Sequence, residues 1–229
     1  RQLFLACKTH AHHMCGIFAI LGTDDTPALA ELVQRSAALL RHRGSDGSGV
    51  KRCRPGVYLA HERLALVGTG KQPLQIGNMT LSVNGEIYNY QELAKTCRLQ
   101  HPLKTDCEII LHLHRRHPPS HWLQQLRGMF GLVLYNDKTQ SWLIARDHLG
   151  IVPLYLGWMS HGALVVASEL KALAHICVRT QPFPPGHFWT SALAAPQRWY
   201  VPSWRKCPGN NPPRLTQLRD LMAKTVTLH

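Results

Sequence analysis

The sequence predicts an α+β fold in which helices pack against antiparallel sheets. Short apolar runs of strand length, such as Leu164–Ala167, recur along the chain, while helical spacing of apolar residues is confined to a few stretches. Glycine and proline turns separate the runs. The order of strand, helix, several strands, helix and many strands is typical of layers around antiparallel sheets. Hydrophobic residues make up 45% of the 229 residues and charged residues 17%, as in globular proteins.

The N-terminal half is expected to begin with a strand and a helix. The segment CGIFAIL, from Cys15, is an apolar run with the length of a buried strand. Thr26 and Pro27 then suit the N-cap and the first position of a helix, which Gly44 is expected to stop. The apolar face of this helix is predicted at Leu29, Leu32, Val33, Ser36 and Leu40. Strands are expected next around Val57–Ala60, Leu64–Val67 and Met79–Val83.

The second half is predicted to contain another helix and a longer series of strands. Asp106 is placed to cap a helix whose apolar positions are Ile109, Ile110 and Leu113. The segments MFGLVLYND and SWLIARD form a plausible hairpin across Asn136-Asp137. The segments LYLGW, ALVVASE and HFWT continue the strands, and helical character returns from Leu215 to the end. A stretch rich in proline and glycine, Pro202–Arg214, is typical of a linker.

The charge balance is strongly basic but does not by itself indicate nucleic-acid binding. The formal net charge is +13, from 26 Lys and Arg against 13 Asp and Glu. These basic residues are scattered, and the contiguous blocks typical of nucleic-acid contacts are missing. A basic surface without a dedicated ligand is the simpler interpretation. No apolar stretch reaches the roughly 18 residues of a membrane-spanning helix, so neither nucleic acid nor a membrane is an expected partner.

The cysteines and histidines do not form a recognisable metal or disulfide pattern. There are 7 Cys, an odd number, without a CxxC pair, which argues against a disulfide framework and a structural zinc site and favours a reducing, cytoplasmic setting. The histidine-rich stretch His112–His121 combines a helix with a loop broken by prolines, so its side chains would not converge on one ion. We therefore expect no metal site.

Cys15 is the candidate nucleophile. If translation starts at Met14, removal of that methionine would leave Cys15 at the N-terminus. The α-amino group, with a pKa near 8, could then take the thiol proton during attack on a carbonyl, as in N-terminal nucleophiles. A buried cysteine on a strand is the alternative, and it would be preferred if this motif stood alone.

Several other motifs accompany Cys15 in a fixed order. They are RHRGSDGSG at Arg41–Gly49, HERLALV at His61–Val67, NGEIYN at Asn84–Asn89, TDCE at Thr105–Glu108, RDHLGIVPLY at Arg146–Tyr155 and ASELKAL at Ala167–Leu173. At these residues the chain resembles the class II glutamine amidotransferases, and within them the glutaminase domain of asparagine synthetases. The last two motifs separate this subfamily from relatives that aminate sugars or phosphoribosyl pyrophosphate.

The resemblance implies a role for each residue of a glutamine site. Cys15 would be the nucleophile and, through its α-amine, the general base. Asn84, by its side chain, and Gly85, by its backbone N–H, would form the oxyanion hole. Arg63 would pair with the substrate carboxylate and Asp106 with the substrate ammonium. The substrate-binding set would be Arg63, Leu64, Ala65, Leu66, Val67, Asn84, Gly85, Glu86 and Asp106.

Each of these residues also has an ordinary structural interpretation. In isolation, Arg63 could be a surface ion-pair partner, Asp106 a helix N-cap, and Asn84-Gly85 a hairpin turn. The joint occurrence in one order favours the glutaminase interpretation over these alternatives.

The resemblance also implies a four-layer αββα sandwich of the N-terminal nucleophile hydrolase type. The expected organisation is an extension of undefined status at 1–13, a glutaminase domain at 14–201, a linker at 202–214, and the start of an ATP-dependent synthetase domain at 215–229. The glutaminase domain would need no cofactor, whereas ATP and Mg²⁺ would serve the synthetase domain, in which aspartate receives the ammonia. The resemblance leaves a homodimer open.

Two departures from the family pattern bear on activity. Ser45 stands where the family has a proline, which frees a turn but removes no reactive group. With residues 1–13 attached, the Cys15 nitrogen is an amide and not a base. A non-catalytic glutamine-binding or interaction module, the glutaminase part of another class II amidotransferase, and a nucleic-acid binder therefore stay as alternatives.

Overall fold

Two antiparallel sheets form the centre of the protein. The computed structural model describes residues 14–65, 68, 70–202 and 214–228. Each sheet has six strands, in the orders β10-β8-β9-β1-β3-β2 and β12-β11-β7-β6-β5-β4. The first sheet contains β1 (Gly16–Leu21), β2 (Gly47–Arg54), β3 (Val57–Arg63), β8 (Tyr155–Trp158), β9 (Leu164–Ala167) and β10 (Arg179–Pro182). The second contains β4 (Leu74–Ile76), β5 (Met79–Ile87), β6 (Gly128–Asn136), β7 (Ser141–Arg146), β11 (His187–Thr190) and β12 (Gln197–Arg198).

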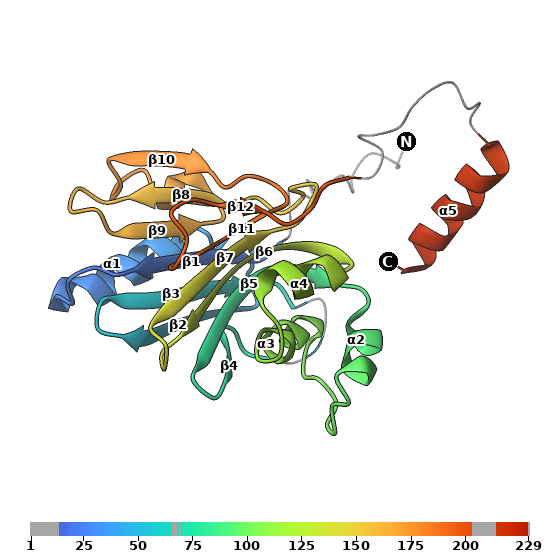
Figure 1. Cartoon of the computed structure of the whole chain (residues 1–229). Coiled ribbons are helices and arrows are strands. Elements are labelled where there is room, and N and C mark those ends of the chain that lie inside the picture. Colours follow the sequence, from blue (N-terminus) through green and yellow to red (C-terminus); the bar gives the residue numbers. More distant parts are fainter. Residues whose placement is uncertain (1–13, 66–67, 69, 203–213, 229) are drawn as a thin grey trace, which may run out of the picture.

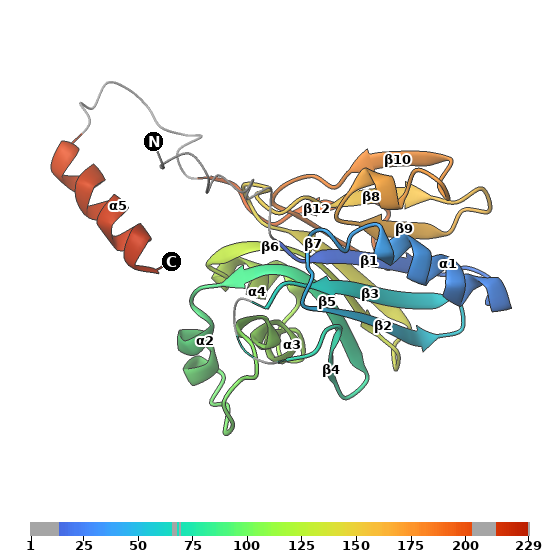
Figure 2. The ribbon, with the colours of Figure 1, turned by 180° about the vertical axis from the view of Figure 1, so that it is seen from behind.

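Helices cover the two outer faces of this pair of sheets (Figure 1). Helix α1 (Pro27–Ala38) packs on the first sheet, and the opposite view shows it on the side away from the second sheet (Figure 2). The short helices α2 (Tyr90–Thr96), α3 (Ile109–His114) and α4 (Pro119–Trp122) pack on the second sheet together with the 3₁₀ turns η1 (Asp106–Glu108) and η2 (Leu123–Gln125). The predicted four-layer αββα arrangement is confirmed.

The strand alternation explains how three apolar layers form. In β1, Ile17, Ala19 and Leu21 enter the layer between the sheets, whereas Phe18 and Ile20 enter the layer under α1. A strand buried on both faces lacks polar positions, which is why CGIFAIL is a continuous apolar run. Strand β6 alternates in the same way in the second sheet. Val133 and Tyr135 face the first sheet, and Leu134 between them faces the helices.

Most predicted elements are present, and three details are wrong. The first helix ends at Ala38, well before Gly44, because the chain turns there to bury Leu40. Leu64 and Ala65 follow the end of β3 instead of forming a new strand, and Leu66 and Val67 lie outside the described residues. Asp106 does not cap its helix, since its carboxylate bonds to β5, and Thr105 takes the N-cap position without a side-chain bond.

The C-terminal helical character is also present. Helix α5 spans Leu215–Leu228, and its residues from Leu215 to Thr227 are exposed. The predicted linker at 202–214 falls mostly on 203–213, outside the described residues. Within the described part of the chain, every helix is too short or too polar to cross a membrane.

Candidate active site

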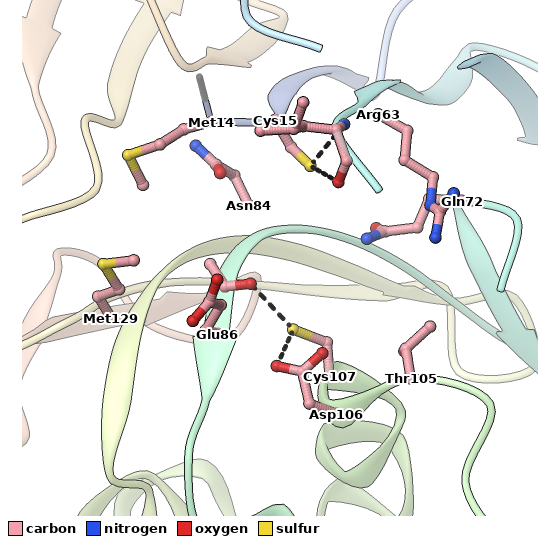
Figure 3. Close-up of a pocket in the computed structure, with 12 residues that line it drawn as sticks. Met14, Cys15, Arg63, Gln72, Asn84, Glu86, Thr105, Asp106, Cys107 and Met129 are labelled. Carbon is pink, nitrogen blue, oxygen red and sulfur yellow. Dashed lines mark hydrogen bonds between the residues drawn. The ribbon is translucent and has the colours of Figure 1, made fainter. Parts of the chain in front are cut away.

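Seven of the predicted site residues, Cys15, Arg63, Leu64, Asn84, Gly85, Glu86 and Asp106, line one cavity. Cys15 immediately precedes β1, Arg63 ends β3, Asn84 and Gly85 lie in β5, and Asp106 begins η1. Figure 3 shows the side chains of Cys15, Arg63, Asn84 and Asp106 around the shared space. The cavity is lined by Met14, Cys15, Arg63, Leu64, Gln72, Asn84, Gly85, Glu86, Thr105, Asp106, Cys107 and Met129. The fold thus brings together segments that are far apart in the sequence.

The Cys15 thiol is held against the chain that leaves β3. The backbone N–H of Leu64 donates to Sγ of Cys15 at 3.2 Å, and the thiol lies 3.5 Å from the Leu64 carbonyl oxygen, which can accept its proton. On the other side, Nε of Arg43 donates to the Cys15 carbonyl at 3.1 Å. The nucleophile candidate is therefore fixed through its backbone and through its sulfur.

Burial controls the protonation of this thiol. Burial raises the pKa of Cys15 above its ordinary value, while the hydrogen bond from Leu64 and the positive charge of Arg63 oppose the rise. A thiol with a raised pKa is mostly protonated at neutral pH, and only the thiolate attacks a carbonyl. The site therefore needs a base close to Cys15 if Cys15 is to react.

Arg63 and the residues after it form one wall of the cavity. The Arg63 guanidinium donates to the carbonyl of Gly68 at 2.7 Å. Ala65 donates its backbone N–H to the Asp46 carboxylate at 2.8 Å, which ties the RHRGSDGSG segment to this wall. Leu64 lines the cavity, whereas Ala65 is not among the described residues that do. The predicted contributions of Leu66 and Val67 fall outside the described residues.

Asn84 and Gly85 form the opposite side, inside β5 and not in a hairpin turn. Asn84 is 1% exposed, and its side-chain Nδ2 is buried without a hydrogen-bond partner in the described structure. Gly85 has a φ of +148°, and a Cβ added there would lie 2.0 Å from the carbonyl oxygen of Met129. Only glycine fits this backbone. An unpartnered buried donor normally costs stability, and this one is available to a group bound in the cavity.

Asp106 is buried and divides its carboxylate between the protein and the cavity. Its Oδ2 accepts the Ile87 N–H at 2.7 Å and the Cys107 thiol at 3.5 Å. No hydrogen bond within the described residues uses its Oδ1. The neighbouring Thr105 hydroxyl is also buried and has no hydrogen-bond partner among the described residues. A carboxylate anchored by one oxygen and free at the other is suited to an ammonium group.

The two motifs that separate subfamilies have structural roles in the described chain. Glu169, from ASELKAL, accepts from Arg43 at 2.8 Å, and its pKa is lowered because hydrogen bonds from Arg43, His42 and Lys171 outweigh burial. In RDHLGIVPLY, Arg146 donates to three carbonyls and Asp147 accepts three backbone N–H groups, which builds a rigid loop away from the cavity.

Sequence reasoning missed several residues that line or support the cavity. Gln72, Thr105, Cys107 and Met129 line it, and Arg43 holds the Cys15 carbonyl. Cys107 and Thr105 sit inside the quoted TDCE motif, but a role for them needs the folded contacts. Among the described residues no group of three or more His, Cys, Asp or Glu side chains is placed to hold a metal ion, including the histidine-rich stretch.

A family comparison defines the class of protein. Residues 14–186 match the family model described as the glutamine amidotransferase domain. The chain therefore belongs to the glutamine amidotransferase domain family. The predicted membership of this group is confirmed, and the matched range contains all the predicted site residues.

Two similar sequences carry the name of asparagine synthetases. The chain is 43% identical to "Asparagine synthetase [glutamine-hydrolyzing] 3" of Arabidopsis thaliana over 198 residues, which cover 83% of this chain and 34% of the relative. It is 40% identical to "Asparagine synthetase [glutamine-hydrolyzing]" of Zea mays over 224 residues, covering 93% of this chain and 37% of the relative. The chain thus spans about a third of the length of these curated relatives.

A solved structure supports the fold independently. Glutamine phosphoribosylpyrophosphate amidotransferase from B. subtilis superposes with a TM-score of 0.68 and 21% sequence identity, covering 82% of this chain and 50% of that chain. This likeness confirms the predicted α+β sandwich fold.

Proposed function

We propose that this chain is the glutamine-hydrolysing domain of an asparagine synthetase, with L-glutamine as its substrate. The observation that carries the proposal is the convergence on one cavity of a thiol, an unpartnered buried amide donor, a guanidinium and a half-anchored carboxylate. Hydrolysis of an amino-acid amide requires these groups: a nucleophile, donors for the tetrahedral oxygen, and one clamp for each charged end of the substrate.

Cys15 is the nucleophile in this proposal. When Cys15 is the N-terminal residue, its α-amine takes the thiol proton, and the sulfur attacks the side-chain carbonyl carbon of glutamine. The amine then returns the proton to the leaving nitrogen, so ammonia departs and a γ-glutamyl thioester remains. Water cleaves the thioester to release glutamate and to regenerate the thiol. The raised pKa of Cys15 is the reason that the separate base is needed.

The cavity walls supply binding and charge stabilisation. Arg63 pairs with the α-carboxylate, since a planar guanidinium fits a carboxylate in a bidentate manner. Asp106 accepts from the α-ammonium through its free oxygen. Asn84 Nδ2 and the Gly85 N–H donate to the oxygen that becomes negative during attack, and loss of one such donor typically costs about 100- to 1000-fold in rate. Leu64 and Glu86 line the cavity beside the substrate. The family resemblance implies further contacts from Ala65, Leu66 and Val67.

The activity of the whole protein extends beyond this domain in the same proposal. Ammonia would pass to an ATP-dependent domain that amidates aspartate and uses ATP and Mg²⁺, and we place the glutaminase unit at 14–201 and the beginning of the second domain at about Leu215. Glutamine hydrolysis itself needs no cofactor. A homodimer is a part of the proposal that rests on the family resemblance. The cytoplasmic location rests on the cysteine pattern, and the lack of nucleic-acid or membrane partners rests on the scattered basic residues and the short apolar runs.

The test is ammonia and glutamate release from glutamine by a chain begun at Met14. This chain keeps every described element, because β1 begins at Gly16. Mass spectrometry verifies that Met14 is removed. We expect turnover that disappears in Cys15→Ala, and no turnover by the 229-residue chain while its Cys15 nitrogen stays in a peptide bond.

A binding module is the second candidate. Met14 lines the cavity in the described structure, and the Cys15 nitrogen that follows it is an amide. Glutamine binding by calorimetry without ammonia release, from a folded chain with a free Cys15 terminus, would support this module and reject the hydrolase.

A further inference from the structure

The segment Val83–Gly85 carries both proposed oxyanion donors, and side chains outside the strand hold it from two sides. On one side the Gln72 amide contacts Val83: Nε2 of Gln72 donates to the Val83 carbonyl at 3.2 Å, and the Val83 N–H donates to Oε1 of Gln72 at 3.1 Å. On the other side the Cys107 thiol donates to the Gly85 carbonyl at 3.4 Å. Both side chains line the cavity (Figure 3).

The position of Gln72 explains why a side chain makes these bonds. Strand β4 pairs with β5 so that Leu74 stands opposite Leu81 and Ile76 opposite Met79. Continued by two residues, the register would place Gln72 opposite Val83. The backbone pairing of β4 with β5 ends at Leu74, two residues short of this position. The Gln72 side chain offers one donor and one acceptor, and it therefore supplies to Val83 the pair of bonds that a strand backbone would have made.

The direction of the Gly85 amide follows from this pairing. Successive residues of an antiparallel strand turn their N–H and C=O groups to opposite edges. The Val83 amide and carbonyl face Gln72, so those of Asn84 face β6, where Asn84 stands opposite Gly131. The Gly85 groups then return to the edge facing the cavity, in agreement with the hydrogen bond that the Gly85 carbonyl accepts from Cys107. Anchoring Val83 therefore fixes the direction of the Gly85 N–H.

Cys107 also links this strand to the substrate clamp. It is 2% exposed, and its thiol contacts the Asp106 carboxylate at 3.5 Å as well as the Gly85 carbonyl. Burial and the Asp106 charge raise the pKa of Cys107 well above its ordinary value, so the thiol keeps the proton that it shares. A neutral donor between two acceptors can hold both in place.

We propose that Gln72 and Cys107 are positioning residues for the oxyanion donors, and that Cys107 in addition positions the Asp106 carboxylate. This inference rests on the proposed glutamine hydrolysis. Neither residue reacts with the substrate. Each fixes groups that do, because donors must already point at the developing charge to lower the barrier. Within the described residues the side-chain hydrogen bonds of Gln72 go only to the oxyanion segment, whereas the Cys107 thiol bonds to both that segment and the clamp, so the two residues have different kinetic signatures.

The kinetic test uses chains begun at Met14 with verified free Cys15. Gln72→Leu is expected to lower kcat about tenfold with little change in KM, since misplacement well under 1 Å costs less than the roughly 100-fold of a full 1 Å. Gln75→Leu is the matched control, because Gln75 is exposed on β4 and its side chain bonds, within the described residues, only to the Gly77 carbonyl. A rise in KM at constant kcat, or equal losses in both variants, would overturn the role of Gln72.

The role of Cys107 is tested by comparing a variant that lacks a donor at this position with one that keeps a donor there. Cys107→Ala removes the donor and is expected to lower kcat and to raise KM, each by about three- to tenfold. Cys107→Ser keeps a donor at the same place and is expected to recover most of both. Cys97→Ala controls for loss of a thiol elsewhere. Equal activity of the Ala and Ser variants would overturn the role, since a packing effect does not distinguish them in this way.

A second readout separates this inference from the proposed function. Hydrogen exchange of the Gly85 and Glu86 amides in the 229-residue chain does not depend on turnover. Gln72→Leu is expected to accelerate exchange there while β1 stays protected, and unchanged exchange would contradict the positioning. An inactive parent enzyme with this local acceleration would overturn the proposed hydrolysis and keep the structural part of the inference.

Discussion

Opposing influences act on the Cys15 thiol, and their balance can be measured without turnover. Burial raises its pKa, while the Leu64 N–H and the Arg63 charge lower it. In the 229-residue chain we therefore expect slow alkylation of Cys15 by iodoacetamide at pH 7. The rate should rise by about tenfold per pH unit until the thiol ionises, because the thiolate is the reacting form. Peptide mass spectrometry follows each cysteine separately.

Arg63→Gln provides the comparison for this prediction. Removing the guanidinium removes an influence that lowers the pKa, so alkylation of Cys15 at pH 8 should become slower than in the parent chain. Cys177, whose pKa burial raises to about 11, is distant from Arg63 in the fold and serves as the internal reference. Faster alkylation of Cys15 in this variant would show that Arg63 acts by covering the thiol and not by its charge.

At the scale of elements, the RDHLGIVPLY segment shows how a recognisable motif can serve structure. Asp147 is fully buried, and its carboxylate accepts the N–H groups of Leu149, Ile151 and Val152 at 3.0–3.1 Å. Asp147→Ala would leave these donors without their partner. A buried donor left unpaired costs about 1–3 kcal/mol. We expect the variant to lose at least about 2 kcal/mol of unfolding free energy in denaturant titration.

Asp137→Ala is the control, because Asp137 lies exposed in the turn between β6 and β7. Its unfolding midpoint should match that of the parent chain. Neither Arg146 nor Asp147 lines the cavity, so the folded fraction of Asp147→Ala should keep the parent KM for glutamine. A large change in KM with unchanged stability would mean that this loop contacts the site, contrary to its position in the fold.

The sequence predicts features that leave a pattern along the chain, and it does not predict contacts that depend on how the strands pair. Apolar runs such as Gly16–Leu21 revealed the central strands, because burial on both faces leaves a continuous pattern. The edge strand Gly47–Arg54 was missed because its side chains are mostly exposed and carry no alternation. Arg63 and Asp106 were predicted from motifs that have defined chemistry. The role of Gln72 could not be predicted, since its bonds to Val83 depend on the register between β4 and β5.

At the scale of the whole molecule, a buried histidine joins the two sheets. His61 on β3 is 1% exposed, and its Nδ1 lies 3.2 Å from the Ser82 hydroxyl on β5 of the other sheet. Ser82 donates its proton to the Ala60 carbonyl at 3.0 Å, so Nδ1 of His61 must be the donor to Ser82. Nε2 of His61 then carries no proton, and it has no partner within the described structure. The burial of His61 therefore requires a neutral imidazole, because a protonated ring would place a charge and an unbonded Nε2–H between the sheets.

This requirement makes the stability of the fold depend on pH. Burial, helped by the Arg63 charge, lowers the pKa of His61 from 6.5 to about 3. As the pH falls below 6.5, the unfolded chain gains a proton at His61, and the folded chain does not gain it until about pH 3. The stabilisation is therefore complete above pH 6.5 and is lost progressively below it. Burial lowers the pKa of His112 and His114 too, so these residues act in the same direction.

Denaturant unfolding of the 229-residue chain at pH 7, 6 and 5 tests this dependence. This range of pH lies above the pH at which Glu169, whose pKa is lowered, begins to take a proton and to lose its ionic contacts. One proton contributes at most about 1.4 kcal/mol per pH unit. His61→Gln, which cannot ionise, is expected to be less stable at pH 7 but to show a slope smaller by up to that amount. His121→Gln, at an exposed position, should keep the parent slope. An unchanged slope in His61→Gln would mean that the imidazole already takes a proton in the folded protein, and that the two sheets tolerate a charge between them.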